Sequence, residues 1–156
     1  MASRVEARLA ELDLELPPPL PAPRSRMRRT ARLGNALSLS GNGPFRGTEL
    51  VYEGKVGADL TLEQARDAAQ LTALNMVRVL RDEGYDLDRV RWVKALGMVN
   101  SDPSFTDQHV VVNGFSETIV DVFGEEQGLH ARSACGMASM PWNMAVEIEA
   151  ICELES

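Results

Sequence analysis

The sequence predicts an α+β fold in which a mixed sheet of about six strands carries two helices packed on one face. Apolar residues recur at helical spacing in two long segments, near 61–84 and 106–123. The segments around them show the two-residue alternation of strands. The elements follow in the order strand, strand, a weaker third strand, helix, strand, helix, strand, strand. This order favours one sheet with its helices on the same side.

The N-terminal part, residues 1–23, is predicted to be a short helix and a proline-rich connection that precede the main domain at 24–156. Ser3 and Glu6 have the spacing of a capping box, which indicates a helix over 2–12. Five prolines between positions 17 and 23 follow it. They impose an extended conformation, because each fixes φ and removes a backbone donor.

The first strands of the domain are predicted over 27–40, where Gly34-Asn35 suits the positive φ angles of a tight hairpin turn. A third strand is predicted near 49–54. The long helix begins after Thr61, whose spacing to Gln64 makes a second capping box, and ends near Gly84. Its alanines allow it to lie close to the sheet.

The second half of the chain supplies a strand at 89–99, a helix at 106–123 that Gly124 ends, and two strands at 131–140 and 145–154 that we expect to pair with each other. Cys135 and Cys152 fall in these apolar strands, where a thiol usually serves as a small buried hydrophobe. Residues 131–140 are apolar on both faces of the strand, so we expect a second subunit to cover the sheet face that carries no helix.

Composition excludes several classes of protein. A hydrophobic fraction of 44% and a charged fraction of 25% are typical of a soluble globular chain, and the formal charge of −7 disfavours polyanion partners such as nucleic acid. Neither a membrane-spanning run nor a signal-peptide core is found, so a cytoplasmic location is expected. His109 and His130 have no partners at ligand spacing, so no metal is predicted.

A set of short motifs resembles one family. The C-terminal part contains His130-Ala131-Arg132-Ser133, Met140-Pro141 and Val146-Glu147-Ile148-Glu149-Ala150-Ile151. This spacing is similar to the terminal signature of the Rid/YjgF (endoribonuclease L-PSP-like) superfamily. The upstream segments 34–44 and 54–57, Phe105 and Asn113-Gly114 resemble its YjgF/chorismate-mutase-like "putative endoribonuclease" branch.

The resemblance implies a chorismate-mutase-like (bacillus-type) fold and a homotrimer with pockets between subunits. Its best-known members hydrolyse 2-aminoacrylate and related 2-imino acids to 2-keto acids and ammonia without a cofactor. Carried over by motif, Arg132 binds the substrate carboxylate and Glu147 orients or activates the attacking water. Ser40, Gly41, Asn113 and Ala134 then line the pocket. Ala134 stands where many members have a cysteine, and Met27 or a neighbouring arginine stands where they have a tyrosine.

The implied chemistry is physically reasonable. A planar guanidinium offers parallel N–H donors that match a carboxylate, and this pair fixes the orientation of a small acid. A protonated imine carbon is already electrophilic, so the protein needs to supply only proximity, a placed water and a proton acceptor.

Three alternatives remain open at this stage. Arg132 could be a structural partner of Glu147 or Glu149. The arginines at 24, 26, 28, 29 and 32 could bind RNA for ribonucleolytic cleavage, although no aromatic residues lie among them to stack bases. The protein could also be a trimer that binds keto acids or similar metabolites without turnover, since Met27 and Ala134 depart from the deaminase pattern.

Overall fold

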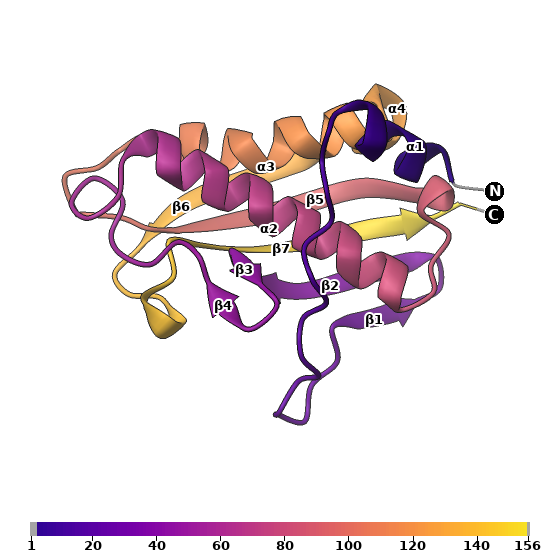
Figure 1. Cartoon of the computed structure of the whole chain (residues 1–156), viewed down its shortest axis with the longest axis horizontal. Coiled ribbons are helices and arrows are strands. Elements are labelled where there is room, and N and C mark those ends of the chain that lie inside the picture. Colours follow the sequence, from indigo (N-terminus) through magenta and orange to yellow (C-terminus); the bar gives the residue numbers. More distant parts are fainter. Residues whose placement is uncertain (1–2, 156) are drawn as a thin grey trace.

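The protein is described by a computed structural model that covers residues 3–155. Its centre is a five-stranded sheet in the order β1-β2-β7-β5-β6 (Figure 1). These strands are β1 (Thr30–Leu33), β2 (Ala36–Asn42), β5 (Val90–Asn100), β6 (Ala131–Met137) and β7 (Val146–Leu154). β5 and β6 run parallel and the other neighbours run antiparallel, so the sheet is mixed, as predicted.

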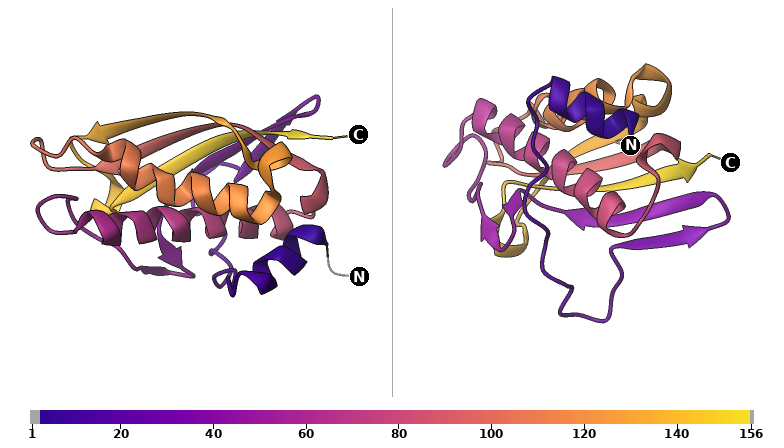
Figure 2. Two further views of the ribbon diagram at one scale, coloured as in Figure 1. Left: turned by 90° about the horizontal axis from the view of Figure 1, so that it is seen from above. Right: turned by 45° about the vertical axis from the view of Figure 1, so that its right-hand side comes forward.

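The helices cover one face of this sheet (Figure 2). The two long ones are α2 (Leu62–Asp82) and α3 (Gln108–Phe123), and the short ones are α1 (Arg4–Glu11) and α4 (Glu125–Gly128). Single 3₁₀ turns follow at Leu87–Arg89 and Pro141–Asn143. Within residues 3–155, no helix has the length and apolarity required to cross a bilayer.

Both predicted capping boxes are present. The Ser3 and Thr61 hydroxyls each accept a hydrogen bond from the backbone three residues later, and the Glu6 and Gln64 side chains return the contact. The first box fixes a helix whose apolar residues Val5 and Leu9 are buried in the core. α1 is therefore packed on the domain, against α3.

Two predictions about the strands were wrong. Of the third strand expected near 49–54, only β4 (Glu49–Leu50) forms, and it pairs with β3 (Phe45–Arg46) in a separate hairpin. The final strands β6 and β7 do not pair, because β5 lies between them and bonds to both. The alternation of apolar and polar residues indicates which face of a strand is buried. It does not identify the neighbouring strand, since any strand with the same alternation can pair with it.

The core lies between the sheet and the long helices. Trp92 of β5 makes edge-to-face contacts with Phe115 and Phe123 of α3, each with ring centroids 5.7 Å apart. α2 and α3 also approach closely at Gly114, where an added Cβ would lie 2.3 Å from the Arg66 carbonyl oxygen. The absence of a side chain at Gly114 permits this spacing.

The face of the sheet that carries no helix is called the open face below. Register places on it Ala31, Ala36, Ser38, Lys94, Leu96, Met98, Ser133, Cys135, Glu147, Glu149 and Ile151. Cys135 is exposed here, contrary to the prediction, because no other element of residues 3–155 covers β6 on this side. Cys152 is buried as predicted, and burial raises the pKa of its thiol to about 12.

Candidate functional site

Arg132 reaches from the edge strand β6 toward α3, on the helix-covered face. Its Nη1 donates to Asn113 Oδ1 at 2.9 Å and to Ser116 Oγ at 3.1 Å, and its Nη2 donates to the His109 carbonyl oxygen at 3.2 Å. These three α3 residues are spaced four and three apart, so they share one side of the helix. Together with Arg132 they form what we call the arginine cluster.

The close fit of α3 on the sheet brings this cluster together. Gly97 of β5 and Ala134 of β6 are register partners beneath the helix. A Cβ on Gly97 would lie 2.5 Å from a methyl group of Val112, so a larger residue would force α3 away. Ala134 is partly buried and packs against the core in this chain. Small side chains at both positions thus hold α3 within reach of Arg132.

The charge of Arg132 is not neutralised by the part of the chain that the structure describes, where its guanidinium forms no ion pair. The nearby Glu117 is bound by Arg66 at 2.6 Å. Burial lowers the pKa of Arg132 and the charge of Glu117 partly opposes this shift, but a guanidinium stays protonated. The structural pairing of Arg132 with Glu147 or Glu149 is therefore not found.

Two donors of Arg132 have no acceptor within residues 3–155. A guanidinium has five N–H bonds, and three of them are used by the α3 contacts. The remaining two are Nε–H and one Nη2–H. A carboxylate can accept from two donors of a guanidinium, one with each oxygen.

Glu147 forms a second cluster on the open face, beside an irregularity in β2. The β2–β7 register shifts between Leu39 and Asn42, so Ser40 and Gly41 occupy a bulge. A Cβ added to Gly41 would lie 2.1 Å from Glu147 Oε1. Only glycine leaves room for the carboxylate in its present position. We call Ser40, Gly41 and Glu147 the glutamate cluster.

The surroundings of Glu147 favour its protonated form. Its side chain is half-buried, and burial raises the pKa of its carboxyl group, with a smaller contribution from the like charge of Glu149. In the described part of the chain no residue donates a hydrogen bond to it. Ser40, by contrast, is engaged, because its hydroxyl donates to the Arg28 carbonyl oxygen at 2.7 Å and its amide to that of Arg29 at 2.9 Å.

The two clusters lie on opposite faces of one sheet. Arg132 pairs in register with Ala95, which faces the helices, whereas Glu147 pairs with Met98, which faces the open side. The structure thus brings Arg132 to Asn113, and Glu147 to Gly41, but does not bring the two groups together. A site that contains both requires a second copy of the chain.

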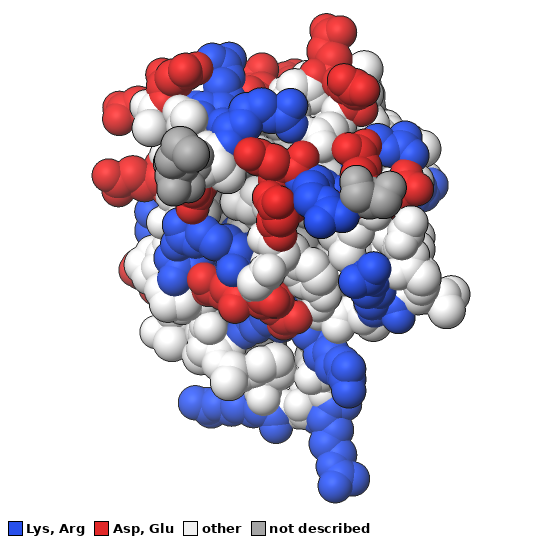
Figure 3. Space-filling view, turned by 90° about the vertical axis from the view of Figure 1, so that its right-hand side faces the viewer, with Lys and Arg blue, Asp and Glu red and all other residues white. Residues whose placement is uncertain are grey.

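Surface hollows lie elsewhere, at the end of β7. The larger has a volume of about 460 Å³ and is lined by residues such as Arg32, Tyr85 and Arg89; the other has about 440 Å³. Acidic and basic side chains intermingle on this end of the molecule (Figure 3). Neither hollow contains a residue of the two clusters.

Ser116 and His130 were not identified as site residues from the sequence. Ser116 Oγ lies 3.0 Å from His130 Nε2, and His130 Nδ1 lies 2.7 Å from the Gly128 carbonyl oxygen. Burial lowers the pKa of His130. The spacing of Asn113 and Ser116 on one helix face, together with His130 two residues before Arg132, was the available signal. Residues 3–155 contain no group of three or more His, Cys, Asp and Glu side chains arranged to hold a metal.

Comparison with known proteins identifies relatives along nearly the whole chain. The family model described as "YjgF/chorismate mutase-like, putative endoribonuclease" matches residues 6–154. Protein TCP17 of Trypanosoma cruzi is 40% identical, over 99% of this chain and 97% of its own length.

Two solved structures are also similar. Atu1372 of Agrobacterium tumefaciens is 39% identical with a TM-score of 0.88, covering 97% of this chain and 93% of its own. A protein of Shewanella oneidensis named a "putative endoribonuclease" is 28% identical with a TM-score of 0.90, covering 98% of this chain and 100% of its own.

Proposed function

The chain belongs to the YjgF/chorismate-mutase-like family, and from this premise we propose that it hydrolyses small 2-imino acids such as 2-aminoacrylate to 2-keto acids and ammonia. Arg132 of one copy binds the substrate carboxylate. Glu147 of a neighbouring copy orients the attacking water and accepts its proton. Ser40, Gly41, Asn113 and Ala134 shape the pocket around these two groups.

The observation that carries the proposal is the state of Arg132. Three bonds to α3 fix its guanidinium, while its Nε–H and one Nη2–H have no acceptor among the described residues. A partly buried cation without a counter-ion favours binding of an anion, and the fork geometry selects a carboxylate. The attacked carbon of a 2-imino acid is bonded directly to that carboxylate, so this grip also fixes the position of the reacting atom.

Glu147 suits the second role. Its raised pKa makes the carboxylate a better proton acceptor than an exposed glutamate, because burial and Glu149 both disfavour its charged form. 2-Aminoacrylate first becomes the protonated imine by taking up a proton at its methylene carbon. Water adds to the imine carbon and gives a proton to Glu147, which returns this proton to the nitrogen of the tetrahedral adduct. The C–N bond then breaks, the departing ammonia takes the hydroxyl proton as the carbonyl forms, and no electrons are transferred to or from the substrate.

Assembly into a homotrimer would bring the two clusters together. The open face carries small and apolar side chains around Glu147 and Glu149, among them Leu96, Met98 and Ile151, as expected of a surface that another copy covers. Sedimentation of the native protein should give three times the mass of one chain. A monomer with full activity would exclude a site shared between copies.

The decisive experiment measures ammonia and pyruvate release from freshly generated 2-aminoacrylate. The native protein should accelerate release over buffer, Arg132→Ala should not, and Arg81→Ala should behave as native, because Arg81 is exposed at the end of α2. Equal release with native protein and buffer refutes the deaminase. Saturable binding of pyruvate by that inactive native protein would then establish a metabolite-binding trimer without turnover.

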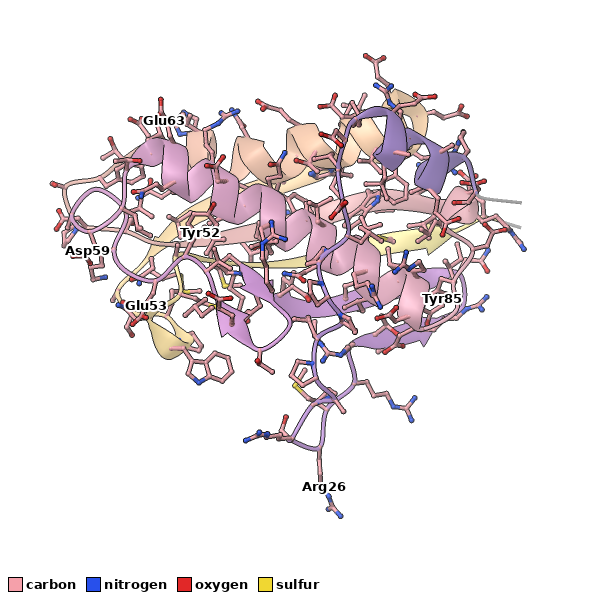
Figure 4. All side chains as sticks on the ribbon, in the orientation of Figure 1. Arg26, Tyr52, Glu53, Asp59, Glu63 and Tyr85 are labelled. Carbon is pink, nitrogen blue, oxygen red and sulfur yellow. The ribbon has the colours of Figure 1, made fainter. Side chains whose placement is uncertain are left out.

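RNA cleavage is the second candidate, because the relative from Shewanella oneidensis is named for it and one surface feature favours it. Arg26 lies in a loop that projects from the body of the molecule (Figure 4), and Arg24 and Arg28 are exposed in the same loop. This loop leads into β1, at the sheet edge opposite Arg132. Cleavage by purified protein that ends in a variant with these arginines changed to serine would favour this function.

A further inference from the structure

We propose that Ser116 and His130 are positioning residues, which form a directed chain of hydrogen bonds that aims the Arg132 guanidinium at its carboxylate ligand. The inference rests on the proposed function for the identity of that ligand. The series of hydrogen bonds is a property of the folded protein and can be tested separately. The inference gives a role to two residues that do not belong to the glutamate cluster and that received no role from the family motifs.

The direction of the chain follows from which groups can only donate and which can only accept. The Gly128 carbonyl oxygen is an acceptor only, so the nitrogen 2.7 Å away, His130 Nδ1, must carry a hydrogen. In a neutral imidazole the other nitrogen, Nε2, is then an acceptor. Ser116 Oγ, 3.0 Å from Nε2, must therefore donate to it.

Arg132 completes the chain because it has donors only. Its Nη1 lies 3.1 Å from Ser116 Oγ, so the hydroxyl accepts from Arg132 while it donates to His130. Arg132 Nη1 thus donates to Ser116 Oγ, Ser116 Oγ donates to His130 Nε2, and His130 Nδ1 donates to the Gly128 carbonyl oxygen. A hydroxyl whose hydrogen is committed in this way cannot rotate, so its lone pair stays directed at Nη1.

The surroundings keep His130 neutral, which this direction requires. The ring packs edge-on against Phe115 of α3, with centroids 5.7 Å apart, and α4 contributes the Gly128 carbonyl oxygen as an acceptor. Arg132 on β6 is the charged group that opposes protonation, and Glu117 on α3 is engaged by Arg66 of α2. Burial lowers the pKa of His130 below its usual 6.5, and the positive charge of Arg132 acts in the same direction.

The first test needs no ligand. The long-range ¹⁵N–¹H spectrum of the native protein at about pH 7.5 should show a neutral His130 ring protonated at Nδ1, the less common tautomer in water. The Arg132 Nη resonances should be sharp in the native protein and broadened in Ser116→Ala. A ring protonated at Nε2, or at both nitrogens, overturns the inference.

The second test uses pyruvate as the carboxylate probe. Ser116→Ala and His130→Phe should each raise the Kd for pyruvate about tenfold, since each removes one bond of a charge-assisted chain. His130→Phe keeps the aromatic contact with Phe115 but offers Ser116 no acceptor. Ser116→Thr, which retains a hydroxyl, should bind within about threefold of native. Unfolding curves identify any variant that has lost its structure.

These outcomes separate the two proposals. Native-like binding by Ser116→Ala overturns the positioning role even if the deaminase is confirmed. If the native protein neither binds pyruvate nor accelerates deamination, the proposed function fails. The tautomer of His130 and the line widths of Arg132 then still decide whether the chain of hydrogen bonds exists.

Discussion

The arginine cluster and the glutamate cluster differ in how completely one chain builds them. Arg132 is held by three bonds from a single helix face, and the two donors left over in residues 3–155 point to one ligand class. Glu147 has space made for it by Gly41 but receives no hydrogen bond from the described residues. Under the proposed function, binding is organised within one copy, whereas the catalytic site is completed by a second.

The largest expected effect comes from removing the cation. Arg132→Ala should lower kcat/KM for 2-aminoacrylate on the order of a thousandfold, because truncating one member of a hydrogen-bonded charge pair costs about 2–5 kcal/mol. Steady-state kinetics with Arg81→Ala as the control measures the effect. A loss below about tenfold would mean that Arg132 does not hold the substrate.

A smaller effect is expected at the bulge that accommodates Glu147. Gly41→Ala places a methyl group 2.1 Å from the present position of Glu147 Oε1, so the carboxylate must move. Turnover should fall about a hundredfold while pyruvate binding changes little, because displacing a general base by about 1 Å costs that much. Ser38→Ala, on the same strand and face, is the control. Equal losses in binding and turnover would contradict the division of labour between the clusters.

Charge removal at position 147 should separate stability from activity. Since the folded-state pKa of Glu147 lies above 4.5, its ionisation destabilises the fold as pH rises past that value. Glu147→Gln should therefore unfold at a higher urea concentration than native at neutral pH, with the advantage vanishing near pH 4, although it is inactive. A variant less stable than native at neutral pH would indicate that the carboxylate has a stabilising partner.

The smallest effect concerns His130, whose folded-state pKa lies below 6.5. The unfolded chain then binds the proton more readily, so the contribution of this residue to stability is complete above 6.5 and is lost as pH falls below it. Native protein should lose more stability than His130→Phe between about pH 7.5 and pH 5.5. Parallel losses in the two proteins would show that the ring is solvated.

Local signals made much of the fold predictable. Both capping boxes located a helix start, and Gly34-Asn35 located the first hairpin, because these patterns act over three or four residues. The partner of β6 was not predictable in this way, since alternation is equally compatible with β5 or β7 as a neighbour. Cys135 was placed in the core for a related reason: its strand is apolar, but one of its faces is left uncovered by residues 3–155.

The candidate site was predictable in part. The motif around Arg132 predicted that this residue supplies the cationic group of the site, and the Asn113 side chain accepts a hydrogen bond from Arg132. Ser116 and His130 were missed because their roles depend on a tautomer and on the approach of α3 to β6, which Gly97 and Ala134 permit. The spacing of Asn113 and Ser116 and the position of His130 show that these residues could lie near Arg132, but they do not show the tautomer or the distance between α3 and β6.

The central claim is that catalysis needs Arg132 of one copy and Glu147 of another. Arg132→Ala and Glu147→Gln chains, each inactive alone, should be unfolded together and refolded in equal amounts. If copies associate at random, about a quarter of the shared sites will then pair an intact arginine with an intact glutamate. The account predicts that about this fraction of native activity returns. A mixture as inactive as either variant, when native protein treated in the same way recovers, would contradict it.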